Sequence, residues 1–339
     1  MGLLPAARVA LEHAVSSAGV PVGARATAVV VLFAAALGVA AEVVAFPFVC
    51  HTGFLLERRY GLSREGFAAW VRGYAQNALV RLVLWVAAVV FVYVAIDRWA
   101  TWWCLVGGAA FAAVSVALTN LAPVLLLPNM FRVRPIRRRR LSSRLEALAR
   151  RAGVPVIGIH EWRVGAWTST ANAALVGIGS TRRILLSDTL IEGYSDAEIE
   201  VVLAHELAHH KYRDIWKMIA CEGGVAMFAL WVSQNVLTAI APALGLEGIG
   251  DVAGLPALVL CVAGVALAAL PLANLLSRRH ERRADRYAIE VTGNREAFLS
   301  GLRRLGAQNL AEARPSRVAE WWFYSHPPLA ERMAAARRG

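Results

Sequence analysis

Residues 201–209 read Val-Val-Leu-Ala-His-Glu-Leu-Ala-His and contain the motif H-E-x-x-H. Residues four apart on a helix lie one above the other, so the imidazoles of His205 and His209 could reach a single metal ion. Glu206 would then lie beside the open coordination position, where a carboxylate can take a proton from water. The alternative is a solvated His/Glu face on an ordinary helix, and the surrounding residues favour the metal site.

The residues around the motif predict a helix that packs into a core. Ser195 and Glu198 have the spacing of a capping box, which satisfies free N–H groups at a helix start. His210 lies about 100° further round the helix than His209, and we expect it to be a flanking, exposed residue. Apolar residues recur at helical spacing at Ala197, Ile199, Val201, Val202, Ala204, Leu207 and Ala208.

The composition predicts a membrane protein. Of the 339 residues, 58% are hydrophobic, and the mean hydropathy is +0.50. Buried core helices are the alternative, but they do not account for several long apolar stretches with few charges. The first 20 residues lack the apolar region of a cleavable signal peptide. Five stretches are long enough, or nearly so, to cross a bilayer: about 28–49, 79–99, 102–127, 218–240 and 252–276.

Loop charges predict the orientation. Residues 131–151 carry nine arginines against one acid, and 277–283 is similarly basic. Residues 241–251 contain Glu247 and Asp251 and no basic residue. Under the positive-inside rule the basic segments are cytoplasmic, while 241–251 and the amino terminus face outward. The net charge of +12 then faces anionic headgroups, and we expect no nucleic-acid partner.

A two-histidine site needs a third protein ligand, and Glu281 is the best candidate. It begins a helical continuation of the fifth apolar stretch, which ends just before it. Asp285 lies one turn further on the same face and could hold a ligating imidazole by its free N–H. The alternative is that both acids only pair with neighbouring arginines. The metal site must lie close to the cytoplasmic face of the bilayer, because His209 and Glu281 both adjoin apolar stretches.

The predicted fold class is mainly α: a polytopic helical membrane protein with a cytoplasmic gluzincin-like zinc-protease domain that contains a small β-sheet. Short strands are expected at 156–162, 172–179 and 183–186. Residues 172–178 are the candidate edge to which an extended substrate could add through its backbone. The expected segments are an N-terminal membrane region with three spans (1–128), the α+β domain (129–217), a membrane hairpin (218–277) and a cytoplasmic part that completes the zinc site (278–339).

Four motifs occur in the order seen in the integral-membrane zinc metalloproteases of the type I CAAX prenyl endopeptidase family, and the chain resembles that family. Residues 57–63 are also similar to a segment that those proteins carry after an early membrane helix. This similarity favours the CAAX-type branch over the shorter HtpX-type proteases. The four motifs are Asn172-Ala173, His205-Glu206-x-x-His209, Glu281-x-x-x-Asp285 and His326-Pro327-Pro328-x-x-Glu331-Arg332.

The resemblance implies one Zn2+ per chain, held by His205, His209 and Glu281, with Glu206 as general base and Asp285 supporting a ligand. The long members of the family are similar to a seven-helix cage with an enclosed chamber. This chain shows five apolar stretches instead.

The resemblance also implies residues that contact the substrate. Asn172 and Ala173 would lie on the substrate-binding edge. His326 and Arg332 would line the site near the substrate or the developing oxyanion. A simpler alternative stays open for the last two, because His-Pro-Pro is typical of a turn and Arg332 could be solvated.

We therefore expect a membrane-embedded zinc endopeptidase of the bacterial plasma membrane, with its active site on the cytoplasmic side. Its partners would be the lipid bilayer and a peptide or protein substrate, membrane-associated or lipidated. The alternatives are an HtpX-like quality-control protease and a non-cleaving, zinc-stabilised membrane scaffold. The intact general base argues against the scaffold, because structural zinc sites fill their fourth position with a protein ligand.

Two acids interrupt the apolar stretches, Glu42 in the first and Glu222 in the fourth. A buried charge in a membrane is costly, so such acids are either functional or paired. An arginine such as Arg58 or Arg81 is the expected partner in the second case, and the residues alone leave both alternatives open.

Overall fold

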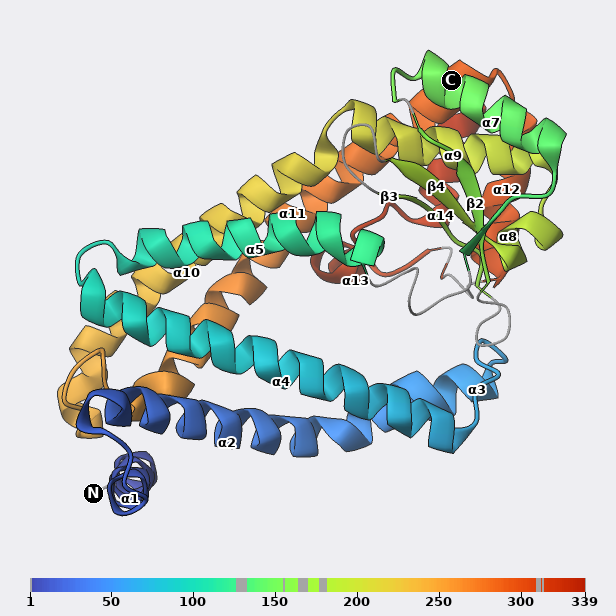
Figure 1. Cartoon of the computed structure of the whole chain (residues 1–339). Coiled ribbons are helices and arrows are strands. Elements are labelled where there is room, and N and C mark those ends of the chain that lie inside the picture. The colour runs from blue at the N-terminus through green and yellow to red at the C-terminus, as the bar shows by residue number, and fades with distance from the viewer. Residues whose placement is uncertain are drawn as a thin grey trace. The chain divides into compact units, whose positions relative to one another are not determined.

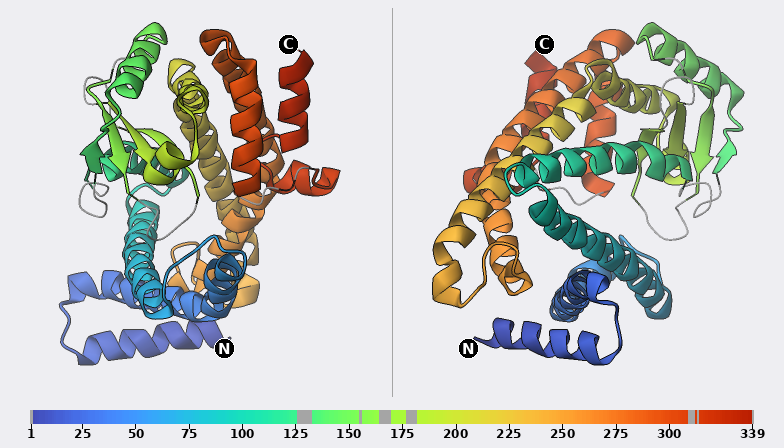
Figure 2. Two further views of the ribbon diagram at one scale, coloured as in Figure 1. Left: turned by 90° about the vertical axis from the view of Figure 1, so that its right-hand side faces the viewer. Right: turned by 60° about the vertical axis from the view of Figure 1, so that its left-hand side comes forward.

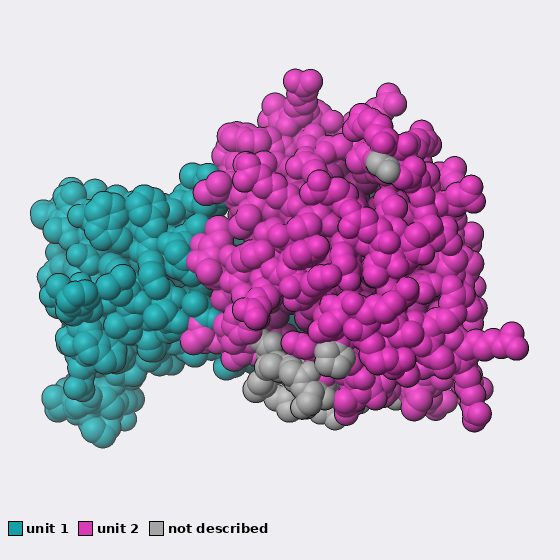
Figure 3. Space-filling view, turned by 90° about the horizontal axis from the view of Figure 1, so that it is seen from above, with its two compact units in different colours: residues 1–57, 66–112, 222–269 teal, residues 58–65, 113–221, 270–339 magenta. Residues whose placement is uncertain are grey.

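The computed structural model describes residues 2–125, 133–154, 156–163, 170–176, 182–308, 312 and 314–338 (Figure 1). The chain forms two compact units, coloured separately in Figure 3. Residues 1–57, 66–112 and 222–269 form what we call the membrane unit, and residues 58–65, 113–221 and 270–339 form the site unit.

Long apolar helices make up the membrane unit and continue into the site unit. They are α1 (Leu3–Ser17), α2 (Val22–Cys50), α4 (Phe67–Arg98), α5 (Trp103–Leu125), α10 (Asp214–Leu244) and α11 (Leu255–Thr292). A π-helical segment, His51–Leu56, joins α2 to the short α3 (Glu57–Arg59).

Four helical segments of the described chain are long and apolar enough to cross a bilayer, while Trp103–Thr119 is a shorter apolar helix. The predicted stretch at 102–127 corresponds to α5, and its last two residues lie outside the described part. The mainly helical, polytopic fold class is confirmed. The four segments are Val22–Arg59, Phe67–Arg98, Asp214–Leu244 and Val252–Thr292.

Helix α1 was not predicted, and an arginine fixes it to the connection between α10 and α11. Arg8 is buried, with Nη1 2.8 Å from Oδ2 of Asp251 and Nη2 2.8 Å from Oε1 of Glu247. Asp251 also accepts hydrogen bonds from the N–H groups of Glu247 and Ala253. The two acids that indicated an outward-facing loop therefore neutralise a buried charge, and the amino terminus lies at the same end of the membrane unit as this loop.

Glu42 has the structural role that was one of its two alternatives. Arg81 of α4 donates to both carboxylate oxygens of Glu42 at 2.9 Å, and the hydroxyl of Tyr74 donates at 2.7 Å. The group pairs α2 with α4. Glu222 is exposed and forms no hydrogen bond or ion pair with the described residues.

Small residues let the membrane helices pack closely. A Cβ atom at Gly108 of α5 would lie 2.0 Å from Cγ of Met227 on α10 and 3.1 Å from its Cα. Such contacts between backbones are typical of helices that associate in lipid. A larger residue at position 108 would force α5 and α10 apart.

The site unit contains a four-stranded sheet of order β1-β2-β4-β3 (Figures 1 and 2). The strands are β1 (Val133–Pro135), β2 (Ile159–Trp162), β3 (Ala173–Val176) and β4 (Arg183–Ser187). β2 and β4 are parallel, and the other two pairs are antiparallel. The predicted edge is confirmed for β3, while residues 177–179 lie outside the described chain. β1 was not predicted.

Further helices complete the site unit, in contact with the sheet or with other helices. They are α7 (Arg139–Arg151), α8 (Asp188–Gly193), α9 (Asp196–Lys211), α12 (Arg295–Gln308), α13 (Arg317–Phe323) and α14 (Leu329–Arg338). The core combines Leu141 and Leu145 of α7 with Leu203 and Leu207 of α9 and Ile184 of β4, all fully buried.

The predicted start of α9 is confirmed. Oγ of Ser195 accepts from the N–H of Glu198 at 3.3 Å, and Oε2 of Glu198 accepts from the N–H of Ser195 at 2.8 Å. This capping box fixes where the helix begins, and its buried apolar stripe then fixes which face turns inward. Together they determine the direction of the histidines one turn apart near its end.

We predict that Leu203→Ala lowers the free energy of unfolding by about 2–5 kcal/mol, because it leaves a cavity in the core beside the H-E-x-x-H helix. Leu203 has no exposed surface. Chemical denaturation in detergent measures the loss. Val202→Ala is the matched control, since Val202 is only partly buried and should cost less. Equal losses for the two variants would contradict the packing described for α9.

Candidate metal centre

Helices α9 and α11 bring three metal-ligating side chains together within the site unit. One ligand atom each from His205, His209 and Glu281 lies within 4.8 Å of the others. The Nε2 atoms of His205 and His209 are 3.3 Å apart. Nε2 of His205 is 3.3 Å from Oε2 of Glu281, and Nε2 of His209 is 3.3 Å from Oε1 of the same carboxylate. The three residues that the sequence singled out as ligands therefore meet at one point.

These separations fit a zinc ion. A tetrahedral ion with donor atoms at about 2.0–2.1 Å holds those atoms about 3.3–3.4 Å from one another. Two imidazoles and one carboxylate are also the donor set of a class of catalytic zinc sites. Because such a set leaves one position of the tetrahedron without a protein ligand, it suits catalysis better than a structural role.

Each imidazole is held from behind by an aspartate. Nδ1 of His205 lies 2.9 Å from Oδ1 of Asp285, and Nδ1 of His209 lies 3.2 Å from Oδ2 of Asp214. A neutral imidazole that donates its Nδ1–H to a carboxylate carries its lone pair on Nε2. Both lone pairs then point at the same place, and they would repel each other unless a proton or a metal ion lay between them.

Asp285 was predicted from the sequence, whereas Asp214 was not. Asp214 is buried at the first turn of α10, and Arg283 of α11 also donates to it. The preceding Arg213 has a φ of 56°, in the left-handed region, so the chain turns sharply between α9 and α10. The sequence offers only an acid five residues beyond His209, because nothing in it marks the turn that brings Asp214 back to the imidazole.

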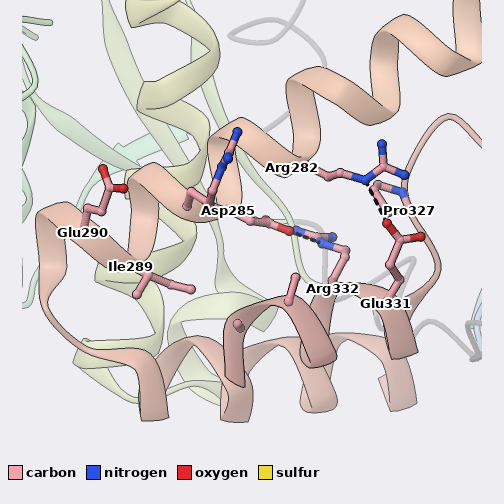
Figure 4. A pocket seen from close by; sticks show the side chains of 10 residues that line it. Arg282, Asp285, Ile289, Glu290, Pro327, Glu331 and Arg332 are labelled. Atoms are coloured by element: carbon pink, nitrogen blue, oxygen red, sulfur yellow. Dashed lines mark hydrogen bonds and ion pairs between the residues drawn. The ribbon is translucent and has the colours of Figure 1, made fainter. Parts of the chain in front are cut away.

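Arg332 supports the centre from α14. Its Nε and Nη2 atoms donate to the two oxygens of Asp285 at 2.8 and 2.6 Å (Figure 4). Burial lowers the pKa of Arg332, but the hydrogen bond and charge of Asp285 outweigh it and raise the pKa overall. The alternative of a solvated Arg332 is therefore wrong. The pair borders a cavity of about 330 Å³ between α11 and α14.

His326 lies beside the third ligand. Its Nδ1 is 2.8 Å from Oε2 of Glu281, and its side chain is 62% exposed. This imidazole is thus next to the metal centre and open to solvent, so an incoming group could reach it. Contact of His326 or Arg332 with a substrate stays a prediction.

The carboxylate of Glu206 forms no hydrogen bond or ion pair with the residues that the structure describes. Burial raises the pKa of Glu206, and the charges of His205 and His209 oppose this effect only in part. A carboxylate with a raised pKa is a better proton acceptor than one in water. Its position and its chemistry suit a general base.

The edge strand β3 packs against α9. Asn172 is exposed, and its backbone N–H and C=O are both bonded to Ser187 at 2.9 Å, which anchors the start of the strand. Ala173 pairs with Leu186 of β4. These bonds hold Asn172 and Ala173 at the edge of the described sheet, next to the helix that carries the histidines.

The expectation that His210 is exposed was wrong. His210 is partly buried and makes a hydrogen bond to the backbone of Leu175 in β3. Burial, together with the nearby charge of Arg182, lowers the pKa of His210 to about 4. A neutral imidazole thus ties β3 to the end of the metal helix, which helical periodicity alone could not reveal because the contact is between distant elements.

The fold and the site define a metalloprotease embedded in a membrane. Residues 135–338 match the model of peptidase family M48, and residues 5–132 match a model described as "CAAX prenyl protease N-terminal, five membrane helices". The chain belongs to peptidase family M48.

Several relatives are similar to this chain in sequence. The chain is 27% identical to the uncharacterized metalloprotease YhfN of Bacillus subtilis, over 84% of this chain and 68% of YhfN. It is 26% identical to the CAAX prenyl protease 1 homolog of Arabidopsis thaliana, over 87% of this chain and 70% of the relative. It is 31% identical to the protease HtpX homolog of Verminephrobacter eiseniae, but over only 54% of this chain and 64% of that protein.

A solved structure has the same fold. The crystal structure of S. mikatae Ste24p superposes with a TM-score of 0.82 and covers 94% of this chain and 77% of its own. Because the two sequences are only 22% identical, the superposition is evidence for a shared fold alone.

We predict that Asp214→Asn weakens metal binding roughly 10–100-fold, because His209 loses the carboxylate that orients its ring. Competition with a chelator measures the affinity. Asp196→Asn is the matched control, since Asp196 lies at the other end of α9 and pairs with Arg138 instead. A loss of affinity that is the same in both variants would contradict the role of Asp214.

Metal binding at neutral pH should release protons. Burial lowers the pKa of His205, but hydrogen bonds to Asp285 and Glu281 outweigh it and raise the pKa to about 9. The metal-free imidazole is therefore protonated at a pH of about 7, and a metal ion must displace that proton. Affinity should rise with pH up to about 9 and then level off. Calorimetry in two buffers of different ionisation enthalpy measures the release, and equal heats in both would contradict it.

Proposed function

We propose that this membrane metalloprotease is a zinc-dependent endopeptidase. Its zinc ion, one per chain, would be held by His205, His209 and Glu281, and Glu206 would be the general base. The observation that carries the proposal is the convergence of the three ligands: the two Nε2 atoms are 3.3 Å apart, and each lies 3.3 Å from one of the two oxygens of Glu281. The aspartates behind both imidazoles support it, because they favour the tautomer that a metal ligand needs.

Each residue then has a chemical task. Zinc in such a donor set polarises a carbonyl group and lowers the pKa of water. Glu206 takes a proton from the attacking water and delivers it to the leaving amine nitrogen. His326, exposed beside Glu281, can donate a hydrogen bond to the oxygen of the scissile carbonyl as negative charge develops there. Arg332 and Asp285 keep His205 oriented throughout.

The substrate would bind along β3. The outer edge of this strand faces no other strand among the described residues, so an extended peptide can add to it through backbone hydrogen bonds. The backbone of Leu175 already makes a hydrogen bond to His210. We therefore place the peptide at the other end of the strand, beside Ala173 and the exposed side chain of Asn172, whose own backbone groups are bonded to Ser187.

We further propose that the centre faces the cytoplasm and that its substrates are membrane-associated or lipidated proteins. The basic segments at 131–151 and 277–283 support this orientation. The division into segments 1–128, 129–217, 218–277 and 278–339 follows from the same charges. A bacterial plasma membrane is the proposed location, and no nucleic acid is expected as a partner.

Among the alternatives, the CAAX-type reading is favoured over an HtpX-like quality-control protease. Residues 5–132 match a CAAX-type membrane region, whereas the HtpX homolog aligns with only 54% of the chain. A non-cleaving scaffold is disfavoured by Glu206, which has no structural partner in the described chain.

We predict that Glu206→Gln keeps about one zinc ion per chain but lowers cleavage by at least roughly 10²–10⁴-fold, because the amide cannot accept the proton. Zinc content and cleavage of farnesylated and plain peptides are measured in detergent. Glu200→Gln is the control on the same helix, since Glu200 pairs with Arg144 away from the centre.

The two readouts separate the alternatives. Zinc in all variants with no cleavage of either peptide by the wild type would favour the scaffold. No zinc in any variant would contradict the proposed site.

A further inference from the structure

Helix α13, in the site unit, exposes large apolar side chains that no part of the described chain covers. Val318 is 69% exposed, Trp321 is 53% exposed and Phe323 is 70% exposed. Val318 and Trp321 lie three residues apart and therefore on one face of the helix. In the left-hand view of Figure 2 this short red helix extends away from its neighbours in the site unit. A patch of this kind needs a partner.

Hydrogen bonds fix α13 to one level of α11. The side-chain amide of Asn274 donates to the carbonyl oxygen of Trp322 at 2.6 Å. Nη1 of Arg278, which is buried, donates to the carbonyl oxygens of Glu320 and Tyr324 at 3.0 and 2.6 Å. These three bonds satisfy carbonyl groups at the end of α13 and hold it beside residues 274–278 of α11.

That level of α11 is the place where the helix leaves the hydrocarbon. Its apolar part runs from Leu255 to Leu276, which is about 33 Å along a helix and close to the roughly 30 Å of a bilayer core. Arginines follow directly at positions 278 and 279. Trp216 of α10 is 51% exposed and lies two positions before the apolar part of its own helix, as aromatic residues at membrane interfaces do.

We propose that α13 is an interfacial membrane anchor, with Val318 and Trp321 inserted at the boundary between headgroups and acyl chains. The partner is the lipid bilayer itself, because hydrogen bonds from Asn274 and Arg278 hold α13 beside the end of a membrane-spanning helix. The exposed side chains of Arg314 and Arg317 lie on the same segment and can contact lipid phosphates.

The anchor also bears on the metal centre. His326 follows Phe323 by three residues and contacts Glu281. A helix held at the interface therefore fixes the segment that carries His326, at a constant depth relative to the bilayer. A substrate delivered from the membrane surface would meet that segment first.

Nitroxide labels test the proposal on the full chain in vesicles of phosphatidylcholine and phosphatidylglycerol. The labels are attached at Val318→Cys and Trp321→Cys in a background without Cys50, Cys104, Cys221 and Cys261 that binds zinc like the wild type. Arg303→Cys on α12 is the matched control, since Arg303 is exposed and donates a hydrogen bond to the backbone carbonyl of Leu299 in its own helix.

We expect labels at 318 and 321 to be accessible to oxygen, which concentrates in lipid, and protected from a water-soluble nickel chelate. The label at 303 should show the opposite pattern. Nickel accessibility at 318 and 321 equal to that at 303 would overturn the proposal. Protection of both positions from both reagents would also overturn it and would indicate a protein partner. Because the measurement needs no cleavage, its outcome is independent of the proposed protease activity.

Discussion

The structure depends on how it accommodates a buried carboxylate between two imidazoles. Glu281 is 5% exposed, and a charge in that position is costly unless opposite charges surround it. The chain surrounds it with alternating charge: imidazoles in contact, aspartates behind them, and Arg283 and Arg332 behind the aspartates. A divalent cation at the centre completes this arrangement, since it supplies positive charge where the donor atoms converge.

The topology follows from bringing those ligands together. The spacing of one helix fixes how His205 and His209 lie relative to each other. The third ligand, Glu281, follows on α11 after a membrane hairpin, so no local structure fixes the position of α11 along α9. Buried packing and ion pairs must do so instead. Asp214, at the start of the hairpin, receives hydrogen bonds from His209 before the hairpin and Arg283 after it. The same aspartate that orients a ligand thereby aligns the two helices that carry the ligands.

Local signals in the sequence were sufficient for the long apolar helices, for α9, for strands β2 to β4 and for the residues that meet at the centre. Each of these signals lies within one or two helical turns: the capping box at Ser195, the H-E-x-x-H spacing and the acid at Glu281. Asp214, the docking of α1 through Arg8 and the bond from His210 to β3 could not be read in this way, because each joins residues from different elements. The prediction that His210 is exposed was wrong for the same reason. Helical periodicity indicates the face of α9 on which His210 lies, but the strand that covers this face, β3, lies elsewhere in the sequence.

Helix α11 is one continuous helix that contains both a membrane-spanning apolar segment and the metal ligand Glu281. Glu281 follows the last apolar residue, Leu276, by five positions, which is about 7.5 Å along the helix axis. Under the proposed function, the hydrophobic length of α11 would therefore set the depth of the metal centre in the bilayer. A peptide whose own end is held in the bilayer arrives at a similar depth, so it needs no long reach to lie along β3. A soluble peptide has no such alignment and would have to be positioned by the strand edge alone, so under the proposed function the membrane would act as part of the substrate-binding surface.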